Sequence, residues 1–194
     1  MRSPNIGCLV MAAGSGSRFR ANKLAAEFDG KTLIRRALEA VPKEVFSAVT
    51  VVTQYPEVAA LAEEFGFSHI YNEQPEDGIS RTIRLGTQAM LACDAIVYMV
   101  SDQPLLERAS VERVVARWKE SPDHIVGAAH HGKRGNPCIF PREFFGELLA
   151  LTGDHGGSAV IRAHPDRLLT VEIGKAELTD VDTPQALEEL KKKQ

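Results

Sequence analysis

The stretch LVMAAGSGSRFRANK, residues 9–23, decides how the rest of the chain is interpreted. It begins as an apolar run typical of a buried strand and then breaks into a glycine-serine turn with cations that include Arg18 and Lys23. In open parallel sheets, ligands bind where such loops leave the carboxyl ends of the strands. Small residues there let backbone N–H groups approach an anion closely. The stretch therefore predicts an anion site, and phosphate is the obvious anion.

Two named phosphate motifs do not fit this turn. The dinucleotide fingerprint needs a third glycine where the chain has Phe19, and the P-loop needs a glycine-lysine-hydroxyl triplet that RANKL does not supply. The turn instead offers Arg18 as a forked donor and Lys23 as a mobile point charge, a pair suited to a triphosphate. The alternative is an ordinary strand-to-helix turn with solvated cations. The position of the turn and its paired cations favour binding.

Short apolar runs alternate along the chain with segments of helical period. Strands are predicted over 6–12, 48–53, 68–72 and 94–102, with amphipathic helices between them. Near-continuous apolar strands interleaved with helices imply a mostly parallel sheet covered on both faces. Beyond Trp118, which continues a helical apolar face, we expect two strands joined by a polar loop over 124–140, strands over 167–173 and 178–183, and a last helix from Pro184. The fold class is α/β, with one domain over residues 1–194.

Composition and charge narrow the protein class. The 194 residues are 44% hydrophobic and 25% charged, and the formal net charge of −3 offers no basic footprint for nucleic acid or an anionic membrane. Apolar runs such as 95–100 are too short to span a bilayer. The start MRSPNIG leaves no room for a secretory signal, so we expect a cytoplasmic protein. Cys8, Cys93 and Cys138 are odd in number and widely spaced, which predicts buried free thiols.

Carboxylates follow strand ends at two distant places. Asp102 of YMVSDQPLL comes directly after the fourth strand, and Asp180 and Asp182 of LTDVDTPQAL point to the same side of an extended segment. Each has a structural alternative, because Asp102 could cap the next helix and Asp182 or Thr183 could cap the helix that Pro184 opens. Brought together opposite Arg18 and Lys23, Asp102 and Asp182 would form a Mg²⁺ site for an activated phosphate.

The motifs LVMAAGSGSRFRANK, DQP, GNP and DVDTP, in this order and spacing, resemble those of the molybdenum-cofactor nucleotidyltransferases. AAG is more similar to the molybdopterin cytidylyltransferases than to the guanylyltransferase branch. The resemblance covers residue 9 to about residue 190 and implies a single-domain, Rossmann-like doubly wound sheet of the nucleotidyltransferase type. It implies transfer of a nucleoside monophosphate, foremost CMP from CTP, to the phosphate of a molybdopterin acceptor with release of pyrophosphate.

The resemblance also implies roles for individual residues. Residues 1–120 would bind the nucleotide and residues 121–194 the acceptor, with Mg²⁺ or Mn²⁺ held by Asp102 and Asp182. The implied catalytic residues are Arg18, Lys23 and Asp102. The implied nucleotide-binding residues are Ala12, Ala13, Gly14, Ser15, Gly16, Arg18, Lys23, Asn72, Gly78 and Ser80. The implied acceptor-binding residues, from two segments similar to loops on the pterin side, are Gly135, Asn136, Pro137, Gly153, Asp154, His155 and Gly156.

Two departures from the family pattern bear on these roles. Arg20 stands where such families usually carry glycine, which stiffens the loop or adds a cation near the phosphates. GDHGGSAVI lacks the alanine and basic residue that relatives often show after the second glycine, and His155 or Arg162 could substitute.

Other functions stay open at this point. One alternative is a nucleotidyltransferase that uses GTP or a sugar-phosphate acceptor, and another is a non-catalytic protein that delivers cofactor to a molybdenum hydroxylase apoenzyme. No convincing Ser/His/Asp constellation is needed, because positioning and charge neutralisation can supply most of the rate of phosphoryl transfer. The adjacent His130 and His131 would point to opposite faces of a strand and could not readily share a metal.

Overall fold

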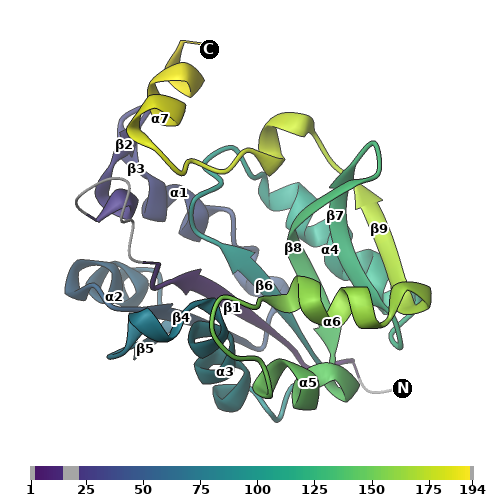
Figure 1. Ribbon diagram of the computed structural model, residues 1–194. Coiled ribbons are helices and arrows are strands. Elements are labelled where there is room, and N and C mark those ends of the chain that lie inside the picture. The colour runs from purple at the N-terminus through teal and green to yellow at the C-terminus, as the bar shows by residue number, and fades with distance from the viewer. Residues whose placement is uncertain (1–2, 15–21, 193–194) are drawn as a thin grey trace.

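The computed structural model describes residues 3–14 and 22–192, and its centre is one seven-stranded sheet (Figure 1). The strand order is β5-β4-β1-β6-β8-β7-β9, and β8 runs antiparallel to both of its neighbours while the other pairs are parallel. The strands are β1 (Ile6–Ala12), β4 (Ala48–Thr53), β5 (Ser68–Tyr71), β6 (Ala95–Val100), β7 (Ile125–His130), β8 (Lys133–Pro141) and β9 (Leu168–Glu172). The predicted mostly parallel α/β sheet is confirmed.

Helices cover both faces of this sheet. Helices α1 (Leu33–Glu39), α2 (Pro56–Glu64) and α4 (Arg108–Glu120) pack on one face, and α3 (Ile79–Ala89), α5 (Phe145–Leu149) and α6 (Gly157–Ala163) pack on the other (Figure 1). Helix α7 (Pro184–Lys191) lies beside a small ribbon of β2 (Glu27–Phe28) and β3 (Lys31–Thr32). Short 3-10 turns include Lys23–Ala25, Pro75–Asp77 and Lys175–Leu178.

Strand β1 shows why the apolar runs form the sheet. It pairs in parallel with β4 on one side and β6 on the other, so its backbone is hydrogen-bonded along both edges. Its side chains alternate between two cores, because Cys8 and Val10 pack with Trp118 on one face while Leu9 packs with Phe140 on the other. Burial on both faces is the reason that the run contains no polar side chain.

Several smaller predictions are also confirmed. The three cysteines are buried and free, and Trp118 is 2% exposed in the core. Thr183, directly before Pro184, caps α7 by accepting a hydrogen bond from the Ala186 N–H. Within the described residues, every helix is too short or too polar to cross a membrane.

Three predictions about local structure are wrong. Residues 179–183 form no strand; Val181 is instead buried and its N–H donates to the Asp102 carbonyl at 2.9 Å, so the segment is anchored by one apolar side chain. GNP, residues 135–137, is not a loop but lies within β8, and the connection to β7 contains only His131 and Gly132.

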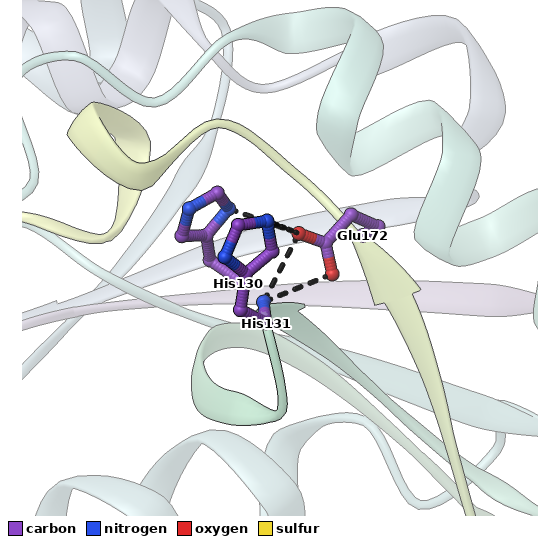
Figure 2. Close-up of side chains that lie close together, drawn as sticks. All are labelled: His130, His131 and Glu172. Atoms are coloured by element: carbon purple, nitrogen blue, oxygen red, sulfur yellow. Dashed lines mark hydrogen bonds and ion pairs between the residues drawn. The ribbon is translucent and has the colours of Figure 1, made fainter.

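The third error concerns the histidine pair. His131 follows the end of β7 and has a positive φ of 47°, so the alternation of a strand does not apply to it. Its ring stacks on that of His130, with centroids 4.1 Å apart, and both rings lie beside Glu172 (Figure 2).

Candidate functional site

A first hollow of about 260 Å³ opens at the carboxyl ends of β1 and β6. This is the place where open parallel sheets bind ligands. Its described lining is Met11, Ala13, Gly14, Lys23, Leu24, Pro75, Gly78, Ile79, Thr82, Val100, Ser101, Asp102 and Asp154. Two of the predicted site residues with opposite charge, Lys23 and Asp102, therefore face one cavity.

Lys23 joins the two predicted metal ligands. Its ammonium lies 2.7 Å from Asp102 Oδ2 and 3.3 Å from Asp182 Oδ1, although the aspartates are far apart in the chain. Burial alone would lower the pKa of Lys23, but the charges and hydrogen bonds of Asp102 and Asp182 outweigh it and raise the pKa above its usual range. Lys23 is therefore a fixed positive charge at neutral pH, with its side chain only 14% exposed.

Asp180 adds a third carboxylate beside this pair. Gln103, which follows Asp102, is buried and donates from Nε2 to Asp180 Oδ1 at 2.9 Å. Burial raises the pKa of Asp180; the Gln103 hydrogen bond opposes the shift, and the charges of Asp102 and Asp182 add to it. The DQP and DVDTP motifs thus meet through both backbone and side chains, as the hydrogen bond from Val181 to Asp102 also shows.

The backbone at the end of β1 is held by the last residue of β4 and the two residues that follow it. Thr53 Oγ1 donates to the Ala12 carbonyl at 3.0 Å, and Gln54 Nε2 donates to the Ala13 carbonyl at 2.8 Å. Tyr55 OH donates to the Gly14 carbonyl at 3.0 Å. Because C=O and N–H point in opposite directions across a trans peptide, the Gln54 contact turns the Gly14 N–H away from β4.

Thr53, Gln54 and Tyr55 were not predicted as site residues. The signal for them was available, because they stand at the carboxyl end of a predicted parallel strand next to the first. Ser15, Gly16 and Arg18, together with Phe19 and Arg20, lie outside the described residues, so their predicted roles stay predictions.

Residues 72–80 meet residues 153–156, two segments that were expected on different sides of the site. Gly78 has a φ of 82°, and a Cβ there would lie 2.5 Å from the backbone of Gly153. Ser80 is fully buried and its N–H donates to the Gly153 carbonyl at 3.1 Å. This contact places Asp154 in the first hollow with Gly78 rather than among the other acceptor residues.

Asn72 is buried and organises its own loop. Its Oδ1 accepts from the Gln74 N–H at 3.1 Å and from Arg81 Nε at 3.0 Å. Asn72 and Ser80 thus shape the wall of the first hollow without being among its lining residues.

A second hollow of about 350 Å³ adjoins the first and is more apolar. Its described lining is Met11, Ile79, Ile83, Tyr98, Val100, Arg134, Gly135, Asn136, Cys138, Phe140, Gly156, Gly157, Ser158, Ile161 and Asp180. Of the predicted acceptor residues, Gly135, Asn136 and Gly156 line this hollow. Pro137, Gly153 and His155 are absent from the described lining of both hollows.

The carboxylates have the donor chemistry that a hard divalent cation requires. Mg²⁺ and Mn²⁺ prefer oxygen ligands, and Asp102 and Asp182 already converge on one cationic atom, the Lys23 nitrogen. The residues present therefore fit a bound divalent cation.

Residues 8–168 match the model of the MobA-like NTP transferase domain. The chain belongs to this family. The fold of this chain is also that of a nucleotidyl transferase from Methanothermobacter, at a TM-score of 0.83 and 21% identity over 98% of both chains. A Mycobacterium tuberculosis protein solved as a complex with manganese shares the fold at a TM-score of 0.73, with 23% identity over 97% of this chain and 98% of that one.

Two curated relatives of this family member differ in how much they share with it. The 3-deoxy-manno-octulosonate cytidylyltransferase of Francisella philomiragia is 29% identical over 63% of this chain, and the match spans only 49% of that relative's length. The purine catabolism protein PucB of Bacillus subtilis is 25% identical over 95% of both chains.

Proposed function

We propose that this chain is a nucleotidyltransferase that moves a nucleoside monophosphate, foremost CMP from CTP, onto the phosphate of a molybdopterin-type acceptor. The observation that carries the proposal is the convergence of Lys23, Asp102 and Asp182 beside the Gly14 turn. Family membership and the cytidylyltransferase among the relatives support the reaction class and the base. A reaction that consumes a nucleoside triphosphate suits the cytoplasm, where we expect the protein.

The proposed reaction has a simple atom balance. An oxygen of the acceptor phosphate attacks the α-phosphorus of the nucleoside triphosphate, the bond from that phosphorus to its bridging oxygen breaks, and pyrophosphate leaves. The attacking oxygen is already anionic at neutral pH, so no general base is required. Positioning and charge neutralisation are then the main sources of rate.

The residues of the first hollow would supply these effects. Lys23 would neutralise phosphate charge, with its protonation maintained by the neighbouring carboxylates. The Gly14 N–H would donate to the nucleotide. Asp102 and Asp182 would hold Mg²⁺ or Mn²⁺, which supplies positive charge to the phosphate oxygens when bound. Arg18 would be the second cation of the turn.

The second hollow is the proposed acceptor site. Its apolar residues Ile83, Phe140 and Ile161 suit the face of a flat ring system, while Arg134 and Asn136 offer donors at its edge. Residues 1–120 would mainly bind the nucleotide and residues 121–194 the acceptor. The two parts would cooperate, since Asp182 contacts Lys23 of the first hollow and Ile79 lines both hollows.

The proposal is tested by measuring pyrophosphate release from purified protein with Mg²⁺ and molybdopterin, each nucleoside triphosphate supplied separately. Release with CTP alone is the expected result, and release with GTP instead would assign the guanylyl branch. A parallel reaction with 3-deoxy-manno-octulosonate tests a sugar acceptor. Nucleotide binding without release for any pair would contradict a transferase and favour a protein that delivers cofactor to a molybdenum hydroxylase.

A further inference from the structure

The turn between β7 and β8 brings together three metal-ligating side chains outside both hollows. His130 ends β7, and His131 and Gly132 form the connection with positive φ values of 47° and 81°. Two positive φ values are the signature of a tight hairpin turn that glycine and asparagine favour over bulkier residues. The turn stacks the His131 ring over that of His130, with 18° between the ring planes.

Glu172 completes the cluster from a different strand. It ends β9, which runs parallel to β7, and its register partner is Ala129, the residue before His130. His130 Nδ1 lies 2.9 Å from Glu172 Oε1, and His131 Nε2 lies 4.0 Å from the same oxygen. Figure 2 shows both rings together on the same side of the Glu172 carboxylate.

Backbone contacts hold this carboxylate in position. The His131 N–H donates to Glu172 Oε1 at 3.0 Å and to Oε2 at 3.2 Å. The Glu172 carbonyl accepts from Arg113 Nη1 at 3.1 Å, which ties the strand end to α4. His130 Nδ1 also lies 3.0 Å from the Ile173 carbonyl oxygen, a contact that needs a proton on Nδ1 and that this nitrogen gives up when it binds a metal. The 58% exposed side chain that brings the negative charge is thus held against the turn by hydrogen bonds from the His131 N–H.

We propose that His130, His131 and Glu172 bind one divalent transition-metal ion such as Zn²⁺. One ligand atom from each residue lies within 4.8 Å of the others. Four-coordinate zinc with bonds of about 2.0–2.2 Å separates its ligand atoms by roughly 3.3 Å. The His131 side chain is 86% exposed, so it can rotate to close this difference. Water completes the coordination on the open side.

The ligand types separate this site from the carboxylate pair in the first hollow. Two imidazoles and one carboxylate suit Zn²⁺, Ni²⁺ or Cu²⁺, whereas oxygen ligands alone suit Mg²⁺. The site also sits on the hairpin whose strand β8 carries Arg134, Gly135 and Asn136 into the second hollow. Bound metal would tie this hairpin to β9 through side chains as well as backbone.

The test is calorimetric titration of the full chain, freed of metal by chelation, with Zn²⁺ in excess Mg²⁺ so that the oxygen-rich site is occupied. His131→Asn removes one imidazole but tolerates the positive φ, and Glu172→Gln removes the charge but keeps an acceptor. His164→Asn is the matched control, because His164 pairs with Glu147 at 2.8 Å without a second imidazole nearby in the described structure.

The expected result is one Zn²⁺ per wild-type chain, with affinity at least about tenfold weaker in His131→Asn and Glu172→Gln and unchanged in His164→Asn. Thermal unfolding in saturating Zn²⁺ provides a second readout, because a ligand that binds the native state raises Tm. This rise should be smaller in His131→Asn and Glu172→Gln than in the wild type at the same Zn²⁺ concentration, because the stabilisation follows the affinity. Equal binding by the wild type and both cluster variants, or no binding by the wild type at millimolar Zn²⁺, would overturn the proposal.

Discussion

The two hollows adjoin each other but are built from different chemistry. They share Met11, Ile79 and Val100 along their border. The first contains the Lys23–Asp102 pair and backbone groups at strand ends, whereas the second is a mainly apolar surface completed by β8 and α6. Under the proposed function, the first hollow would neutralise the charge of the nucleotide and the second would recognise the shape of the acceptor.

Loss of the Asp102 carboxylate should have the largest effect. Asp102→Ala removes the nearer partner of Lys23 and one of the two proposed cation ligands, so kcat should fall by about a thousandfold. The Kd for the nucleoside triphosphate, measured by calorimetry, should change far less. The exposed Asp166→Ala is a suitable control. Near-normal turnover of Asp102→Ala would contradict the proposed role of Asp102 in the first hollow.

The contact between residues 72–80 and residues 153–156, at the wall of the first hollow, can be broken at Gly78. Gly78→Ala combines a φ of 82° with a Cβ 2.5 Å from the Gly153 backbone, so the free energy of unfolding should fall by about 3 kcal/mol. Gly30→Ala is the matched control, because Gly30 has a φ of 71° but open space around it, and should cost only about 1 kcal/mol. Equal losses in urea denaturation would mean that backbone conformation, and not contact between the two loops, sets the cost.

A substitution in the second hollow should affect one substrate only. Asn136→Ala removes donors from the proposed acceptor edge and should raise the acceptor KM by about tenfold while the nucleotide KM stays within twofold. Initial rates with one substrate varied at a time measure both constants. A larger effect on the nucleotide KM than on the acceptor KM would mean that β8 binds the nucleotide and not the acceptor.

The smallest effect concerns Cys138, a thiol in the lining of the second hollow. Burial raises its pKa to about 12, with Arg134 opposing the shift. Since the thiolate is the reactive form, the thiol should resist iodoacetamide at pH 8 and react readily in denaturant. Intact-mass measurements over time follow the labelling, with peptide mapping to identify the site. Labelling of native Cys138 at the rate of a small free thiol would show that the hollow is open to water at this depth.

The central strands and part of the first hollow could be predicted from the sequence. The order of apolar runs identified β1, β4 and β6 because strands buried on both faces have little freedom in composition. Asp102 and Lys23 could be expected to meet because they follow neighbouring strands at one edge of the sheet.

Features set by long-range packing could not be predicted in this way. The burial of Asn72 and Ser80 depends on contacts with Arg81 and Gly153. The two-residue strands β2 and β3 carry no periodic signal, and residues 179–183 alternate like a strand although no strand pairs with them in the described structure. His131 was predicted to continue the alternation of β7. Its positive φ could not be foreseen, because it depends on the length of the turn that follows the strand.

The anchoring of Val181 has a consequence for exchange between related proteins. Its buried side chain packs with Phe28, Leu33 and Leu187, and its N–H binds the backbone of Asp102. A chimera that joins residues 1–120 of this chain to the remainder of a relative would keep the observed placement of Asp182 beside Asp102 only if the donor supplies an apolar residue that packs with Phe28 and Leu33. Exchange of the segment after residue 120 therefore depends on this packing as well as on the Gln103–Asp180 hydrogen bond.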